Sequence, residues 1–141
     1  MLGACIGDII GSVYELSAWK SRVFALFSEK SEFTDDTVCT IAVAECLLDG
    51  SDPAAGLRKW CHRYPGRGYG GSFAVWLRDA GMGPYNSYGN GAAMRVSPAA
   101  WLAGDLDEAL ALARHVTSVT HNHPEGIKGA EATVTAIWLA R

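Results

Sequence analysis

The chain reads Phe33-Thr34-Asp35-Asp36-Thr37, followed without a break by the apolar run Val38-Cys39-Thr40-Ile41-Ala42-Val43-Ala44-Glu45-Cys46-Leu47-Leu48. Glu45 is the one charged residue of that run, which therefore predicts a buried helix from Thr34 or Asp35 to about Asp49-Gly50. Two adjacent carboxylates between threonine hydroxyls are hard oxygen ligands, which Mg²⁺ and Mn²⁺ prefer. Asp and Thr also cap helix starts and suit the positive end of the helix dipole. Capping and metal binding both remain open for this stretch.

Composition limits the class of protein. The chain has 141 residues, enough for one domain with one core, and 49% of them are hydrophobic. A formal charge of −3, a pI near 5.7 and the lack of a basic run argue against a nucleic-acid partner. The four cysteines lack the paired close spacing of a zinc site, and we expect free thiols in a reducing cytoplasm. The acidic, non-basic amino terminus predicts neither a signal peptide nor a membrane anchor.

Turn and capping signals place the other elements. Helices are expected over Met1–Tyr14, from Pro53, over Phe73–Ala80, from Ala92 with an interruption at Pro98, from the capping box at 105–108 to about Val119, and from Pro124 to the end. Residues 17–32 and 81–91 are expected to be loops. No segment alternates apolar and polar residues with a period of two, so the predicted fold is all-α.

The first predicted helix has two notable faces. Gly3, Gly7 and Gly11 recur every four residues and form a smooth stripe that favours close helix packing. Asp8 and Glu15 lie on one face if the helix reaches that far. An acid in an apolar helix is costly to bury unless it is paired or bound to a cation.

Glycine-rich and histidine-containing loops complete the candidate chemistry. Gly70-Gly71-Ser72 and Ser87-Tyr88-Gly89-Asn90-Gly91 can present backbone N–H groups to a phosphate, and they can equally be simple turns. His121 and His123, before Pro124, can be metal ligands or ordinary loop and cap residues.

These motifs together resemble the ADP-ribosylglycohydrolase family, which includes dinitrogenase reductase-activating glycohydrolase and the ADP-ribosyl-acceptor hydrolases. The resemblance runs over essentially the whole chain and in the family's order. It is carried by Gly7-Asp8, Gly11-Ser12, Tyr14-Glu15, Phe33 to Thr37, Gly68-Tyr69-Gly70, Ser87 to Arg95, Thr120-His121, Gly126 and Gly129-Ala130.

The resemblance implies an all-helical fold around a two-metal cleft that holds Mg²⁺ or Mn²⁺. It also implies a hydrolase that cleaves the bond between C1″ of ADP-ribose and an acceptor on a protein or a small molecule. Thr34, Asp35, Asp36 and Glu15 match metal ligands of the family, and Glu15, Asp35 and Asp36 match its catalytic acids. The residues that match its ADP-ribose-binding loops are Gly70, Gly71, Ser87, Tyr88, Gly89, Asn90, Gly91 and His121.

The chain departs from the family in one respect. The family completes its metal site with a second acidic motif, Gly-Asp-x-Asp-Thr, which this sequence lacks, and its domain is roughly twice as long. Residues 1–141 are therefore expected to be the amino-terminal part of a single domain: a fragment, a truncated gene product or a degenerate relative. With half of the ligands, we expect one ion or none, and impaired hydrolysis.

Two further expectations complete the sequence-based picture. The last helical pattern, with Ile137 and Trp138, is still running at the final residue, so its apolar face is expected to be uncovered and to favour self-association. A non-catalytic ADP-ribose-binding or structural protein is the main alternative to the enzyme. A metal-dependent phosphohydrolase would account for the Asp pair but not for the loop Ser87–Arg95. The sequence leaves the acceptor open among arginine, serine, a nucleobase and a small molecule.

Overall fold

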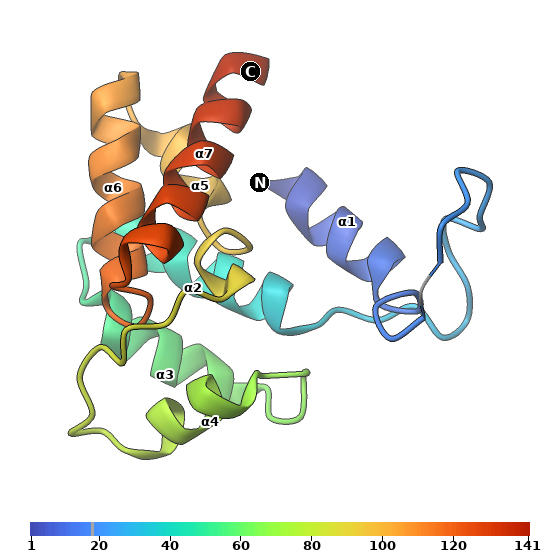
Figure 1. The fold of residues 1–141 in the computed structure, drawn as a ribbon, viewed down its shortest axis with the longest axis horizontal. Coiled ribbons are helices and arrows are strands. Elements are labelled where there is room, and N and C mark those ends of the chain that lie inside the picture. Colours follow the sequence, from blue (N-terminus) through green and yellow to red (C-terminus); the bar gives the residue numbers. More distant parts are fainter. Residues whose placement is uncertain (18) are drawn as a thin grey trace.

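The computed structural model describes residues 1–17 and 19–141, and within these ranges it contains helices and no strand (Figure 1). The predicted all-α fold is confirmed. The elements are α1 (Leu2–Gly11), α2 (Asp35–Asp49), α3 (Pro53–Arg63), α4 (Gly71–Arg78), the 3-10 turn η1 (Asn90–Ala92), α5 (Ser97–Leu102), α6 (Leu106–Ser118) and α7 (Pro124–Ala140).

Helix α2 is the central element of the core and begins and ends as its sequence predicts. The Thr34 hydroxyl accepts the N–H of Asp36 at its start, and Gly50 ends it with a left-handed φ of 73° that glycine adopts without strain. Eight of its residues are buried, and it packs against α3 and α5. The N-terminus of α2 is therefore held in place by a buried helix body.

Helices α6 and α7 form an antiparallel pair, with α5 packed against both of them (Figure 1). The capping box is confirmed, because Asp105 accepts the N–H of Glu108 and the Glu108 carboxylate accepts the N–H of Gly104. Pro98 lies in the first turn of α5, where a missing N–H costs nothing, so this proline begins a helix rather than interrupting one.

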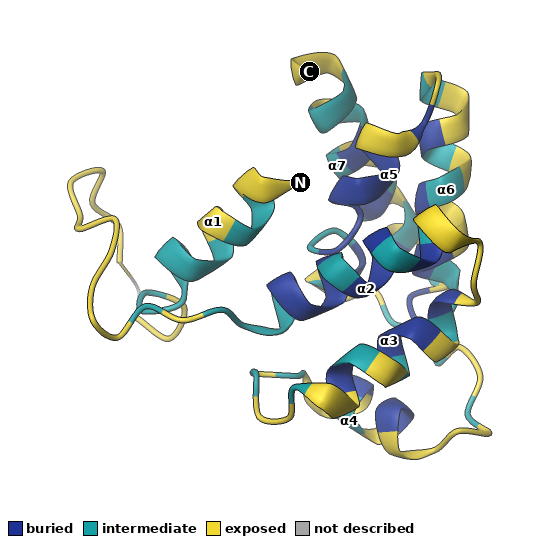
Figure 2. Ribbon diagram, turned by 180° about the vertical axis from the view of Figure 1, so that it is seen from behind, coloured by how far each residue is buried: buried dark blue, intermediate teal, exposed yellow. Residues whose placement is uncertain are grey.

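Helix α1 is shorter than predicted and lies apart from the core (Figure 1). It ends at Gly11, and Glu15 lies in the turn segment 12–17 instead of on the Asp8 face of a longer helix. No residue of α1 is buried, which Figure 2 shows as a helix without dark blue. At this end of α1 the Ser12 hydroxyl donates to the carbonyl of Ile9.

The end of α7 is covered more than its sequence suggests. Ile137 and Trp138 are half-buried against the core, and the guanidinium of Arg141 lies 3.6 Å from the Trp138 ring centroid. Leu139 is the exposed apolar residue there, at 76%. The expectation that Ile137 and Trp138 are uncovered is therefore wrong, because both lie against the core.

No helix among the described residues is long and apolar enough to cross a bilayer. Cys5, Cys39, Cys46 and Cys61 are free thiols, and the Sγ atoms of Cys39 and Cys61 lie 3.8 Å apart between α2 and α3.

Candidate functional site

The acidic residues of the sequence motifs surround one cavity of about 790 Å³. Its walls come from α1 and the turn after it, from the N-terminus of α2, and from η1, α5 and α7. Thr34, Asp35, Asp36 and Glu15 all line this cavity. The structure thus brings the four predicted metal and catalytic residues to one place, and their roles as ligands and catalytic groups stay predictions.

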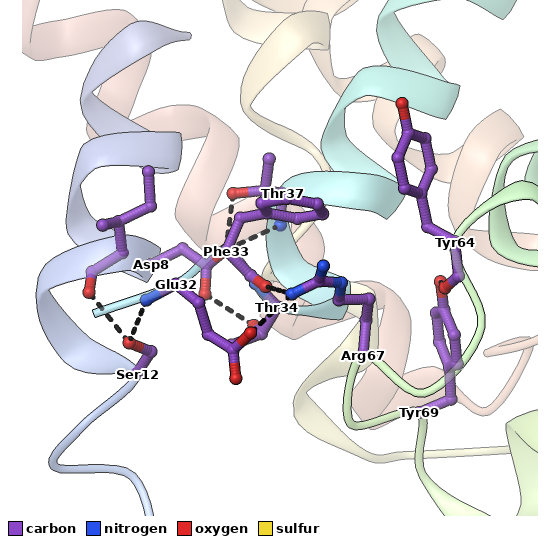
Figure 3. Close-up of polar contacts among 10 residues, drawn as sticks. Asp8, Ser12, Glu32, Phe33, Thr34, Thr37, Tyr64, Arg67 and Tyr69 are labelled. Carbon is purple, nitrogen blue, oxygen red and sulfur yellow. Dashed lines mark hydrogen bonds and ion pairs between the residues drawn. The ribbon is translucent and has the colours of Figure 1, made fainter. Parts of the chain in front are cut away.

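Asp8 ties α1 to the N-terminus of α2 (Figure 3). Its carboxylate accepts the backbone N–H groups of Thr34 and Thr37, at 2.8 and 3.2 Å, and both of their hydroxyls. Oδ2 accepts three of these bonds and Oδ1 accepts the fourth, so Oδ1 keeps one acceptor position. Asp8 is therefore a structural clasp for this wall of the cavity, although it also lines it.

The sequence shows that Asp8 needs a partner but not which one. Its partners are 26 and 29 residues away, beyond the reach of any local pattern. The Thr34 hydroxyl donates its proton to Asp8, so both acceptor positions of its oxygen remain available. One of them accepts a long, weak hydrogen bond of 3.4 Å from the N–H of Asp36. Thr34 both caps α2 and retains an oxygen suited to a cation.

The Asp pair carries unbalanced negative charge. Burial raises the pKa of Asp35 to about 6, and the neighbouring charge of Asp36 adds to this effect. Burial also raises the pKa of Asp36, followed by the charges of Asp8 and Glu15. Among the described residues, the ion pairs lie elsewhere and none involves these carboxylates. Partly buried carboxylates without a cationic partner favour a bound cation.

The fit of a metal ion to this cavity is partial. The Asp35 and Asp36 carboxylates and the Thr34 hydroxyl oxygen are hard donors, which suit Mg²⁺ or Mn²⁺. Within the described part of the chain, however, no three Asp, Glu, His or Cys side chains lie close enough together to hold one ion. The donor chemistry fits such an ion, and the number of converging carboxylates is low.

A second cavity, of about 220 Å³, adjoins the first. Both cavities are lined by Asp35, Gly70, Asn90 and Met94. The second is bounded by the N-terminus of α4, by the loop before η1 and by His121. Of the residues predicted to bind ADP-ribose, it brings together Gly70, Gly71, Ser87, Gly89, Asn90, Gly91 and His121.

Two of the aromatic and histidine residues lie outside both cavities. Tyr88 is 75% exposed, and its ring centroid lies 5.4 Å from that of His123. His123 is the N-cap of α7, because its Nδ1 accepts the N–H of Glu125. The structure gives His123 a capping role, and the predicted ligand contact of Tyr88 stays a prediction.

His121 belongs to a buried polar chain that the sequence did not reveal. The Thr120 hydroxyl lies 2.8 Å from His121 Nδ1, and it accepts an N–H of Arg95 at 2.6 Å. Arg95 and Thr120 are fully buried, and His121 is 5% exposed. Burial, followed by the charge of Arg95, lowers the pKa of His121 to about 4, so the ring is neutral near pH 7.

Arg95 is a buried cation without a carboxylate partner among the described residues. Its Nη2 donates to Thr120 and to the carbonyl of Val116, while its Nε has no hydrogen-bond partner within the same residues. It lines the second cavity. An uncompensated buried positive charge favours an anion in the space that it faces.

Gly126 allows the His121 loop and the Ser87 loop to meet. A Cβ on Gly126 would lie 2.8 Å from the carbonyl oxygen of Ser87 and 3.3 Å from that of His121. We expect Gly126→Ala to lower the free energy of unfolding by about 1–3 kcal/mol, as overpacking does. The new Cβ of Gly129→Ala, on the same helix, would meet nothing within 4 Å. This substitution should raise the free energy of unfolding by about 0.5–1 kcal/mol. Urea unfolding of both variants checks this, and equal midpoints would contradict the close contact.

Comparison with known proteins agrees with the motifs. The ADP-ribosylglycohydrolase family model matches residues 1–141. ADP-ribosylhydrolase ARH3 of Mus musculus is 29% identical over 175 residues, covering 99% of this chain and 47% of the relative. The proteins of the same name from Xenopus tropicalis and Homo sapiens are each 28% identical, with 49% and 48% of their lengths covered. The chain spans about half the length of these curated relatives, and it belongs to the ADP-ribosylglycohydrolase family.

Proposed function

We propose that this chain forms the ADP-ribose-binding part of a metal-dependent ADP-ribosylglycohydrolase, which cleaves the C1″ bond between ADP-ribose and an acceptor. The observation that carries the proposal is the shared wall of the two cavities. A cavity lined by carboxylates adjoins one lined by glycine loops, Arg95 and His121. A ligand with a sugar at one end and a diphosphate next to it needs these two environments side by side.

The second cavity suits the diphosphate. The N-terminus of α4 has Gly70 as its N-cap and Gly71 as its first residue, so its unpaired N–H groups have no side chain in front of them. A Cβ on either glycine would meet nothing within 4 Å, so the space there is open. The buried charge of Arg95 favours an anion at the same place.

The first cavity suits the ribose and the reacting bond. Asp35, Asp36 and Thr34 would hold Mg²⁺ or Mn²⁺, with Glu15 nearby. When bound, such an ion supplies Lewis-acid polarisation and orientation of ribose hydroxyls. Glu15 or one carboxylate of the Asp pair takes a proton from the attacking water. The negative charge of these carboxylates also offsets the positive charge that develops at the anomeric carbon.

A non-catalytic ADP-ribose-binding protein is the second candidate. It is favoured by the lack, among the described residues, of three converging side chains that could hold one ion. This role needs only the second cavity, and it would leave ADP-ribose affinity independent of a divalent metal.

Isothermal titration of the chain with ADP-ribose tests the proposal. In Mg²⁺ we expect binding about tenfold or more tighter than in EDTA, corresponding to one favourable charge interaction. Asp36→Asn should abolish this difference and keep the metal-free affinity, because Asp36 lines only the first cavity. Asp107→Asn, which removes the same charge from an exposed position on α6, is the matched control. Absence of binding by folded protein would refute the proposal, and binding that ignores Mg²⁺ would favour the non-catalytic role.

A further inference from the structure

The ring nitrogens of His121 face different surroundings. Nδ1 contacts the buried Thr120 hydroxyl, while Nε2 lies toward the Gly89 and Gly91 backbone at the second cavity. A Cβ added to Gly91 would be 3.0 Å from Nε2. The tautomer of this neutral ring therefore decides whether the cavity receives a hydrogen-bond donor or an acceptor.

The direction of the hydrogen bonds follows from Arg95. A guanidinium only donates, so the contact from Arg95 Nη2 uses an acceptor position of the Thr120 oxygen. The Thr120 oxygen has a second acceptor position, so a protonated Nδ1 could also donate to it, but the buried hydroxyl proton of Thr120 would then have no acceptor among the described residues. An unprotonated Nδ1, 2.8 Å away, accepts that proton. The cost of an unpaired buried donor therefore favours the tautomer with its ring proton on Nε2.

We propose that Arg95 and Thr120 are positioning residues that fix His121 as the Nε2–H tautomer, so that it donates a hydrogen bond to an oxygen of ADP-ribose in the second cavity. The identity of that ligand rests on the proposed function, whereas the tautomer rests on the contacts of the chain itself. A diphosphate oxygen accepts from Nε2–H and would be repelled by an unprotonated Nε2.

The surroundings of His121 support a permanently neutral donor. The ionisable groups that line the second cavity with it are Arg95, Asp35 and Tyr85. Burial of the His121 ring opposes its protonation, and so does the positive charge of Arg95. The Tyr85 ring centroid lies 6.1 Å from that of His121, and burial raises the pKa of Tyr85, so its phenol is neutral. The ring should therefore keep one proton, on one nitrogen, from pH 7 down to about pH 5.

Two-bond ¹H–¹⁵N NMR of the ligand-free chain tests the tautomer directly. His121→Gln identifies the His121 signals, and His62 and His115 serve as reference histidines on α3 and α6. We expect His121 to show an unprotonated Nδ1 and a protonated Nε2 between pH 5 and 8. Thr120→Ser, which keeps the hydroxyl, should keep this pattern. Thr120→Val, which loses the hydroxyl, should populate both tautomers.

Titration with ADP-ribose then tests the consequence for binding. Thr120→Ser should bind like the unmodified chain, and Thr120→Val should bind about tenfold more weakly, as expected for a lost hydrogen bond to a charged group. A protonated Nδ1 in the unmodified chain would overturn the proposal even if Thr120→Val does not fold. An unchanged tautomer in folded Thr120→Val would also overturn it. If the tautomer is as expected and ADP-ribose does not bind, Arg95 and Thr120 do fix the tautomer of His121, and the proposed function fails.

Discussion

The 141-residue chain is expected to release ADP-ribose from a modified protein at least about a thousandfold more slowly than a full-length relative such as mouse ADP-ribosylhydrolase ARH3, because groups that ligate a metal act as a unit and their losses are not additive. The physical reason is the small number of converging ligands. Within the described part of the chain, no three Asp, Glu, His or Cys side chains lie close enough together to hold one ion. An ion held by so few carboxylates binds weakly, so the Lewis-acid and orienting chemistry that depends on it is largely lost.

The measurement is ADP-ribose release in Mg²⁺ and in Mn²⁺, with ADP-ribose affinity determined in parallel. A chain joined to the second half of the mouse relative is the positive control and should regain turnover. Sedimentation velocity shows whether the active species is a monomer, and it also tests the predicted self-association. Rapid turnover by a monomer of 141 residues would show that the carboxylates described here are sufficient.

Asp8→Asn is expected to release α1 from the core and to open one wall of the first cavity. Asparagine has one acceptor oxygen, and its amide N–H₂ would face donors from Thr34 and Thr37. Losing charged hydrogen bonds and leaving donors unpaired costs about 2–4 kcal/mol, so amide protection in α1 should fall by about 30- to 700-fold. Since α1 buries no residue, little else holds it.

Hydrogen exchange of α1 and α2 checks this prediction. Protection of the α2 interior should change little, because the body of α2 packs against α3 and α5. Asp107→Asn again removes one exposed charge elsewhere and should leave both helices unchanged. If α1 stays protected in Asp8→Asn, the clasp is not what docks it. The glycine stripe does not provide the close packing that its spacing suggests, because a Cβ on Gly3, Gly7 or Gly11 would meet nothing within 4 Å.

The sequence predicted the elements whose boundaries are encoded locally. Helix α2 follows from Thr34 and Gly50, α6 from its capping box, and the start of α7 from Pro124. The sequence overestimated the length of α1. Apolar residues with a glycine at every fourth position predict a helix, but they do not show whether a neighbouring element is present to extend it. The sequence also started α4 two residues late, since Gly71 and Ser72 are poor helix formers that the fold nevertheless includes in its first turn.

The residues of the candidate site could be predicted from the sequence, whereas the contacts between them could not. The motifs named residues of both cavities because each motif is a short continuous stretch. The Asp8 clasp and the contact of Arg95 with Thr120 join residues more than 20 positions apart, and no periodicity reports such pairs. Arg95 lies within one of the motifs, yet only its complete burial beside the second cavity distinguishes it from an ordinary surface arginine.

The position of α1 has a consequence for the order of folding. The contacts among α2, α3, α5, α6 and α7 can form without it, whereas α1 must close a long loop to reach the start of α2. The core can therefore assemble first, and the charges of Asp8 and Glu15 join those of Asp35 and Asp36 only when α1 docks. Because the contacts among the other helices do not involve α1, substitutions in α1 can alter the acidic pocket over evolutionary time without risking the core on which it is built.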